Sequence, residues 1–364
     1  MKKVLSVFGT RPEAIKMAPV VKELESRKEI KSIVCVTAQH RNMLDQVLDI
    51  FKIKPDFDLN IMKPGQTLSY ITSEVLKGIE EVLKKEKPDL VLVHGDTTTA
   101  MAAALAAFYQ QIPVGHVEAG LRTYDKYSPF PEEMNRQIID KIADYLFAPT
   151  EVSKENIGIK LNNGQKVLVT GNTAIDALKT TVSTNYSHSD LDWAKDSRLI
   201  LVTAHRRENL GKPMRNIFLA IRRILNEYSD VKVIYPVHLN PKVQSVAKEV
   251  LGNLDRVRLI EPLDVLDFHN FMERAYFIMS DSGGVQEEAP SLGKPVLVLG
   301  DTTERPEGIK AGTLELVGTN EEDVYRSAKE LLDNKEKYKK MSEAKNPYGD
   351  GLASKYIVDA ILED

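Results

Sequence analysis

The chain has 364 residues, more than one compact hydrophobic core usually organises, so two domains are expected. Its hydrophobic content of 42% and charged content of 28% are typical of globular proteins, and a net charge of −4 argues against nucleic acid or an anionic membrane as a partner. The single cysteine, Cys35, excludes a disulfide framework within one chain, and no apolar run approaches a membrane span. A cytoplasmic location is therefore expected.

The first half of the chain alternates short β-rich runs with helical patterns. The expected strands are residues 3–9, 32–38, 90–96, 114–120 and 145–150. Helical patterns such as residues 12–25 and 68–86 lie between them. An alternation of this kind predicts a parallel sheet that is covered by helices on both faces.

A second alternating series follows a polar stretch at residues 180–197. Its expected strands are residues 199–205, 231–238, 257–262, 275–282 and 295–301. The fold class is therefore α/β, with two doubly wound, Rossmann-like domains that face a cleft. We expect domains at 1–170 and 171–345, and a closing helix in 346–364 that packs back on the first domain.

Ligands bind beyond the carboxyl ends of the strands in open α/β sheets, so the residues after each strand are the site candidates. The first strand runs into GTRPEAIK at residues 9–16. Thr10 and Glu13 form a capping-box pattern at a helix start. Arg11 and Lys16 then place two cations near that helix start, where anions are attracted. Phosphate binding and solvent-exposed charge both remain open for them.

Two further strand ends carry His94-Gly-Asp96 and His116-Val-Glu118. Residues two apart on a strand share a face, so each pair could converge. Three interpretations fit these residue types: a metal site, hydrogen-bonded strand ends, or carboxylates that transfer protons.

A loop with two prolines, residues 121–131, leads to a helix that opens with Glu132 and Glu133. Acidic residues in a first helical turn usually complement the helix dipole. A loop of this length after a strand is nevertheless often functional.

The second half offers a cluster of cations after its first expected strand. The segment TAHRREN places His205, Arg206 and Arg207 together, and His238 follows the next strand in a similar position. Such a cluster suits a diphosphate, although a solvated run of charges is the alternative.

The segment SDSGGVQEEAPSLGKP at residues 280–295 begins a short helix with two glycines. Gly283 and Gly284 after Ser282 allow the backbone to approach a ligand, and free amides at a helix start can bind phosphate. Pro290 is expected to end this helix. No dinucleotide fingerprint or Walker motif is present in the sequence.

Taken together, the motifs resemble the non-hydrolysing UDP-N-acetylglucosamine 2-epimerases. The matching segments run in order from residue 5 to about residue 320: FGTRPEAIK, HGDTTT, HVEAGLRT, SPFPEEMNR, TGNTAIDAL, TAHRREN, PVHLNP, SDSGGVQEEAPSLGKP and DTTERPEG. The resemblance implies a B-type glycosyltransferase fold and the interconversion of UDP-N-acetylglucosamine and UDP-N-acetylmannosamine. It also implies a homodimer that uses no metal or nicotinamide cofactor.

The resemblance assigns roles by motif position. The implied catalytic residues are Asp96, Glu118, Glu132 and His205. The implied substrate contacts are Arg11, Lys16, Phe268, Ser282, Gly283, Gly284, Glu288 and Arg305, of which Glu288 would bind the ribose and Phe268 would lie near the uracil. An allosteric site for UDP-N-acetylglucosamine would use Gln39, Gln66, Arg206 and His238. Gly65 departs from the arginine that activated members carry there.

The implied reaction is elimination of UDP to a 2-acetamidoglucal, followed by re-addition after C2 is reprotonated on its other face. The nearest alternatives are a hydrolysing 2-epimerase that releases N-acetylmannosamine and a 2-epimerase of a UDP-diacetamido-uronic acid. A metal-dependent hydrolase using His94, Asp96, His116 and Glu118, a retained glycosyltransferase activity and a non-catalytic nucleotide-sugar sensor are further alternatives.

Overall fold

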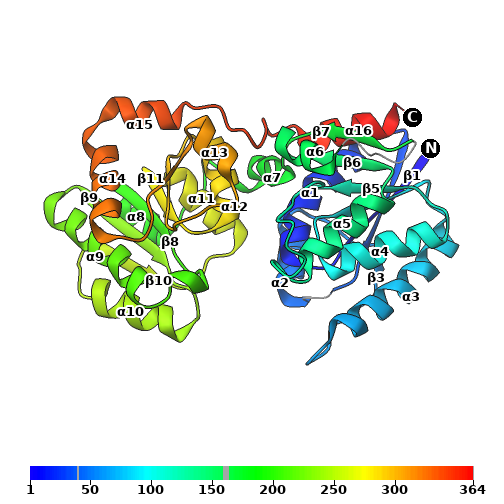
Figure 1. Cartoon of the computed structure of the whole chain (residues 1–364), viewed down its shortest axis with the longest axis horizontal. Coiled ribbons are helices and arrows are strands. Elements are labelled where there is room, and N and C mark those ends of the chain that lie inside the picture. Colours follow the sequence, from blue (N-terminus) through cyan, green and yellow to red (C-terminus); the bar gives the residue numbers. More distant parts are fainter. Residues whose placement is uncertain (39–40, 159–163, 364) are drawn as a thin grey trace. The chain divides into compact units, whose positions relative to one another are not determined.

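The computed structural model describes residues 1–38, 41–158 and 164–363, and it divides the chain into two units (Figure 1). The first comprises Met1–Ala177 together with the carboxyl-terminal segment from Tyr348 onward, and the second comprises Leu178–Pro347. In the described part of the chain, no helix is both long and apolar enough to cross a lipid bilayer.

The first unit contains a seven-stranded parallel sheet in the order β3-β2-β1-β4-β5-β6-β7. Its strands are β1 (Lys2–Phe8), β2 (Ile30–Val36), β3 (Phe57–Asp58), β4 (Leu90–His94), β5 (Val114–Val117), β6 (Tyr145–Ala148) and β7 (Lys166–Val169). Both edge strands, β3 and β7, are additional to the sequence prediction. The two residues of β3 are too short for a pattern, and no residue of β7 is fully buried.

Helices cover both faces of this sheet. They are α1 (Arg11–Ser26), α2 (Arg41–Ile50), α3 (Leu68–Glu86), α4 (Thr98–Tyr109), α5 (Glu132–Ile142), α6 (Glu151–Ile157) and α16 (Ala353–Leu362). Helix α7 (Thr173–Thr181) crosses from the first unit into the second. Helices α3, α4 and α5 pack together on one apolar face. Helix α16 packs against α1, where Arg27 pairs with Asp359 at 2.7 Å, so the end of the chain belongs to the first unit.

The second unit contains a six-stranded parallel sheet in the order β10-β9-β8-β11-β12-β13. Its strands are β8 (Arg198–Thr203), β9 (Val231–Pro236), β10 (Val257–Ile260), β11 (Phe277–Ser280), β12 (Val296–Val298) and β13 (Leu314–Leu316). The sequence prediction did not include β13, because three residues at a sheet edge leave almost no pattern.

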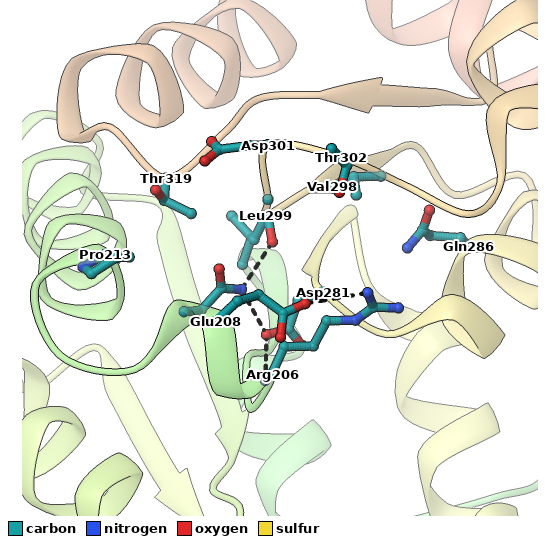
Figure 2. Close-up of a pocket in the computed structure, with 12 residues that line it drawn as sticks. Arg206, Glu208, Pro213, Asp281, Gln286, Val298, Leu299, Asp301, Thr302 and Thr319 are labelled. Carbon is teal, nitrogen blue, oxygen red and sulfur yellow. Dashed lines mark hydrogen bonds and ion pairs between the residues drawn. The ribbon is translucent and has the colours of Figure 1, made fainter. Parts of the chain in front are cut away.

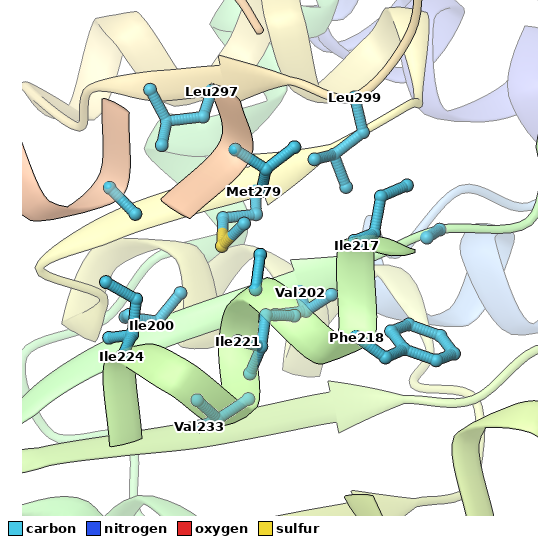
Figure 3. Packing of buried hydrophobic residues seen from close by; sticks show 14 of the residues in the cluster. Ile200, Val202, Ile217, Phe218, Ile221, Ile224, Val233, Met279, Leu297 and Leu299 are labelled. Atoms are coloured by element: carbon cyan, nitrogen blue, oxygen red, sulfur yellow. The ribbon is translucent and has the colours of Figure 1, made fainter. Parts of the chain in front are cut away.

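Helices again cover both faces of the sheet. They are α8 (Ser189–Ala194), η1 (Arg207–Asn209), α9 (Lys212–Glu227), α10 (Pro241–Leu251), α11 (Val265–Arg274), α12 (Gly283–Glu288), η2 (Ala289–Leu292), α13 (Pro306–Ala311), α14 (Glu321–Asp333) and α15 (Lys335–Ser342). Helices α9, α10 and α14 bury one face, as the packing of Phe218 and Ile221 from α9 on Val202 and Met279 illustrates (Figure 3). Helices α8, α11 and α12 bury the other face.

The strand order reverses between β1 and β4 in the first sheet and between β8 and β11 in the second. The crevice at such a reversal, beyond the carboxyl ends of the strands, is where open α/β sheets bind ligands. Gly9 and Gly95 follow the first pair of strands, and Ala204 and Asp281 follow the second. Both reversals therefore open onto residues that the sequence motifs contain.

Candidate functional site

In the first unit, a tight turn carries the chain from β1 into α1. A Cβ atom on Gly9 would lie only 2.0 Å from Thr37 Oγ1, so this position requires glycine. The carboxylate of Glu13 accepts the backbone N–H groups of Gly9 at 3.0 Å and Thr10 at 2.8 Å. This capping arrangement fixes the first turn of α1, from which Arg11 and Lys16 extend. Arg11 is half-buried, and it has no hydrogen bond or ion pair within the described residues.

Glu118 is the centre of the polar cluster at this edge. Its side chain is largely buried and forms an ion pair with Lys16. Asn172 donates to Glu118 Oε2 at 3.2 Å, and His94 Nε2 lies 3.7 Å from the same oxygen. The backbone of Glu118 has a φ of 65°, a left-handed conformation that is unfavourable for a non-glycine residue. Strain of this kind is concentrated at functional sites.

The strand-end pairs form differently from the sequence prediction. Strand β4 ends at His94 and β5 ends at Val117, and Gly95 has a φ of 63°, so residues two apart do not share a strand face there. Instead, His94 approaches Glu118 of the neighbouring strand end. The expectation of convergence was wrong for His116 and Glu118, because both ring nitrogens of His116 bind other groups. His94, by contrast, lies close enough to Asp96 to act on the pKa of that carboxyl.

Asp96 and Glu118 have pKa values that move in opposite directions. Burial raises the pKa of Asp96 above its ordinary value. The guanidinium of Arg136, whose Nη2 lies 2.9 Å from Asp96 Oδ2, lowers that pKa and so offsets part of the effect of burial. Burial would also raise the pKa of Glu118, but Lys16 and His94 hold it well below the ordinary value. At equal pH, Glu118 is therefore the stronger candidate for a base and Asp96 for a proton donor.

The two glutamates that open α5 have different environments. Glu133 is fully buried and accepts the backbone N–H groups of Thr123 at 3.0 Å and Tyr124 at 3.1 Å. Glu133 therefore holds the preceding loop in place. Glu132 has a buried Oε2 that lacks a hydrogen-bond partner among the described residues. Such an unsatisfied oxygen in a polar cluster fits a role with a ligand better than a role in capping.

His116 does not face Glu118. Its Nδ1 lies 2.6 Å from Asp140 and its Nε2 lies 2.6 Å from the carbonyl oxygen of Gly95, and the ring is fully buried. Arg122 also pairs with Asp140. With both ring nitrogens engaged, His116 is a structural residue here and does not serve the metal site considered above. The described residues contain no group of three or more His, Cys, Asp or Glu side chains that could hold a metal.

In the second unit, Asp281 organises the loop that follows β8. Its Oδ2 accepts the backbone N–H groups of His205 and Arg206, both at 2.8 Å, and the side-chain amide of Asn209 at 3.0 Å. The His205 ring is partly exposed and stacks on His238, with ring centroids 5.4 Å apart. The cationic cluster predicted after this strand is thus anchored on one buried carboxylate.

The glycine-rich turn of α12 lies beside arginine side chains. A Cβ atom on Gly283 would lie 3.5 Å from Nη2 of Arg305 and 4.0 Å from Nη2 of Arg206. Glu287 binds Nε of Arg305 and so orients its guanidinium group. The turn from Ser282 to Gly284 therefore presents its backbone next to positive charge, as an anion site requires. The α-helix ends at Glu288, just before Pro290, as the sequence predicted, and the 3₁₀ turn η2 then leads to the left-handed Gly293.

A cavity of about 210 Å³ opens at the carboxyl ends of β8, β11 and β12. Arg206 and Glu208 lie on one side of it, and Asp301 and Thr319 lie on the opposite side (Figure 2). Asp281 also lines this cavity. Both polar and apolar side chains line the cavity, which lies at the strand-order reversal where a ligand is expected.

Two further predicted contacts lie on helices α11 and α12. Glu288 Oε2 is 3.3 Å from His269 Nε2, and His269 Nδ1 is 2.6 Å from the hydroxyl of Thr181. This chain of contacts gives Glu288 a fixed position. Phe268 is half-buried against the apolar cluster that contains Phe271.

The predicted allosteric positions are distributed over both units. Gln39 lies outside the described residues. Gln66 belongs to the first unit, where its side chain accepts the backbone N–H of Lys63 at 3.5 Å. Arg206 and His238 belong to the second unit and lie beside His205.

Sequence reasoning missed four residues that complete these clusters: His94 as a neighbour of Glu118, Asn172, Arg136 and Asp281. Asn172 and Arg136 stood inside quoted motifs, TGNTAIDAL and SPFPEEMNR, so their motif membership was the available signal. Asp281 likewise stood inside a motif, SDSGGVQEEAPSLGKP, and its burial and its three donors now show what it does there.

Comparison with known proteins places this chain among close relatives. A profile of the family described as UDP-N-acetylglucosamine 2-epimerase matches residues 22–362. The UDP-N-acetylglucosamine 2-epimerase of Bacillus subtilis is 64% identical over 99% of this chain and 95% of its own length. A crystal structure named as a putative enzyme of this kind from Listeria monocytogenes has a TM-score of 0.95 and 60% identity, covering 99% of this chain and 96% of that one. The Neisseria meningitidis enzyme bound to UDP-GlcNAc has a TM-score of 0.87 and 52% identity over the whole of both chains.

Proposed function

The chain belongs to the UDP-N-acetylglucosamine 2-epimerase family and has its B-type glycosyltransferase fold, and from that membership we propose that it interconverts UDP-N-acetylglucosamine and UDP-N-acetylmannosamine. The observation that carries the proposal is the pair of carboxylates Asp96 and Glu118. They lie at the carboxyl edge of one sheet, and their pKa values are shifted in opposite directions. A reaction that removes and returns a proton on carbon needs such a pair.

The chemistry explains why two carboxylates are useful. The C2 hydrogen of the sugar has no adjacent carbonyl group to acidify it, so simple deprotonation is unfavourable. In an elimination, the C2–H electron pair forms the C1–C2 double bond as the C1–O bond to UDP breaks. Re-addition of UDP after protonation on the opposite face of C2 then gives the epimer. We assign the base role to Glu118 and the proton-donor role to Asp96. Glu132 is close in sequence to Arg136, and Arg136 binds Asp96.

The second unit supplies the groups that the leaving UDP needs. In our proposal, the amides of Gly283 and Gly284 and the guanidinium of Arg305 bind the diphosphate, and His205 stabilises its growing charge. Glu288 binds the ribose and Phe268 lies near the uracil. Arg11 and Lys16 are kept as proposed substrate contacts of the first unit. The support for this assignment is the cluster of cations around the glycine turn.

We propose that no metal or nicotinamide takes part. The support is that His116, one of the four residues a metal site would use, is committed through both ring nitrogens.

A hydrolysing or uronic-acid-specific activity remains the alternative, because the described side chains do not distinguish these substrates. A cytoplasmic location is proposed on the single, buried cysteine Cys35.

A homodimer is also proposed. Phe108 and Tyr109, at the end of α4, are 57% and 63% exposed and lie with ring centroids 6.2 Å apart. Tyr109 lines a cavity between α3 and α4 together with Leu76 and Ala106. Neighbouring exposed aromatic side chains of this kind are enriched in protein interfaces.

An allosteric response through Gln66, Arg206 and His238 stays a proposal, and the glycine at position 65 argues against it.

One experiment tests substrate, reaction and mechanism together. The protein is incubated with UDP-N-acetylglucosamine in heavy water with a chelator and followed by proton NMR. We expect UDP-N-acetylmannosamine with deuterium at C2. Free N-acetylmannosamine would favour the hydrolysing alternative, and product without deuterium would contradict elimination. No turnover, with turnover restored by a divalent metal, would contradict the metal-free proposal.

A further inference from the structure

Asp281 has one carboxylate oxygen fully used and one unused. The residue follows β11 directly and is 2% exposed. Its Oδ2 accepts three hydrogen bonds, of which two come from the backbone of His205 and Arg206. Its own backbone N–H donates to the carbonyl of Thr203 at 3.1 Å. The carboxylate is therefore held in one orientation by groups from β8 and from the loop that follows it.

The other oxygen, Oδ1, is buried and has no hydrogen-bond partner within the described residues. A buried carboxylate oxygen without a donor is costly, so such atoms usually serve a purpose. The ring nitrogen Nδ1 of His205 lies 3.4 Å from this oxygen. That distance is longer than an ordinary hydrogen bond. Catalytic hydrogen bonds are often long before substrate binds and shorten afterwards.

The other groups around His205 leave Asp281 as the acceptor for its Nδ1. His238 stacks on the ring with an interplanar angle of 6°. Nδ1 of His238 accepts the backbone N–H of Asn240 at 3.1 Å, so that nitrogen carries no proton. Arg206, next in the chain, pairs with Glu208 at 3.4 Å and approaches Glu304 at 3.9 Å. The guanidinium of Arg206 therefore pairs with Glu208 and Glu304 and not with Asp281 Oδ1.

We infer that Asp281 is a positioning residue for His205: Oδ1 accepts the Nδ1–H hydrogen bond and thereby fixes both the tautomer and the orientation of the ring. Nε2 is then left for the substrate, on the side of the ring opposite the buried carboxylate. This inference rests on the proposed function. When Nε2 takes up a proton, the imidazolium is balanced by Asp281 and can donate to the diphosphate as UDP leaves.

The tautomer can be observed directly. The chain contains seven histidines, so long-range proton–nitrogen NMR of histidine-labelled protein is tractable, and comparison with the His205→Gln variant assigns the signals. We expect the Nδ1 of His205 to carry the proton in the wild-type protein with UDP bound. An unprotonated Nδ1 would overturn the inference. This readout needs no variant of Asp281 and no turnover.

The variant Asp281→Asn tests the consequence for catalysis. The amide oxygen of asparagine can accept the same three donors, which places its NH2 group against Nδ1 of His205. That group donates, so it forces the proton onto Nε2. We expect kcat to fall by about 10²- to 10⁴-fold, while KM changes little, as for other catalytic histidines with the wrong tautomer.

Two comparisons separate positioning from general damage. In the His205→Gln background, Asp281→Asn should cost almost nothing further, because it acts through the ring. Equal losses in both backgrounds would overturn the inference. Asp255→Asn, an exposed residue at the amino end of β10, serves as the control and should match wild type. If the wild-type protein shows no epimerase turnover, the proposed function fails, while the NMR result still decides the Asp281–His205 contact.

Discussion

Lys16 and Glu118 form an ion pair although 102 positions separate them in the chain. Lys16 lies in the second turn of α1, and Glu118 lies just beyond β5. The contact is largely removed from water. Burial would raise the pKa of Glu118, but Lys16 and His94 hold it well below its ordinary value. The charge of Glu118, the proposed base, therefore depends on a helix that lies 102 positions earlier in the chain.

Replacing Lys16 with methionine should move the acidic limb of the pH–rate profile to higher pH. The pKa of Glu118 is held below its ordinary value, so the wild-type carboxylate stays ionised down to low pH. Without Lys16, burial raises that pKa, and a higher pH is needed to produce the base. The measurement is kcat from pH 4 to pH 9. Lys22→Met, which removes an exposed pair with Glu25 on the same helix, should leave the profile in place.

Replacing Glu118 with glutamine should reduce turnover without weakening UDP binding. Loss of a general base typically costs about 10²- to 10⁴-fold in kcat. UDP affinity, measured by calorimetry, should stay within a few fold of wild type, because the proposed diphosphate contacts lie in the second unit. A parallel loss of both quantities would show that Glu118 binds substrate and does not transfer the proton.

Much of the fold could be predicted because the central strands are continuous apolar runs. Strand β4, LVLVH, is buried along its whole length, and such a run between helical patterns has few other interpretations. The edge strands β3, β7 and β13 escaped prediction. They have two to four residues, and they are paired on one side only. Their strand state comes from the neighbouring strand and not from their own sequence.

The site was predictable in its location but not in its contacts. Motif position placed Asp96 and Glu118 at strand ends, yet it could not show that His94 faces Glu118 or that His116 faces Asp140. These partners come from different strands and helices, so no local spacing encodes them. The left-handed backbone conformation of Glu118 could not be predicted from the sequence either, because glutamate rarely adopts it.

Replacing Asp140 with asparagine should destabilise the protein. Asp140 is buried between His116, at 2.6 Å, and Arg122. Removing one partner of a buried ion pair typically costs about 3–5 kcal/mol of unfolding free energy. The measurement is urea unfolding followed by circular dichroism at pH 7. Asp49→Asn, at an exposed position of α2, is the matched control and should change the midpoint little.

The same variant should alter how stability depends on pH. Burial would raise the pKa of Asp140, but His116 and Arg122 lower it below its ordinary value. The unfolded carboxyl has a pKa of about 3.9, so its stabilisation is complete above that pH and is lost as pH falls through the lower folded value. Asp140→Asn should remove this part of the acid-induced loss. An identical acid dependence in both proteins would contradict the assignment.

Charged residues at positions 108 and 109 should convert the proposed homodimer to monomers. Phe108 and Tyr109 are exposed on α4, and an apolar pair buried in an interface cannot accommodate two carboxylates without a large desolvation cost. We expect the Phe108→Glu, Tyr109→Glu double variant to halve the mass measured by light scattering. Leu316→Glu, at a 39% exposed position in the second unit, should leave the mass unchanged. A wild-type protein that is already monomeric would contradict the dimer, whereas a double variant that stays dimeric would place the interface elsewhere on the surface.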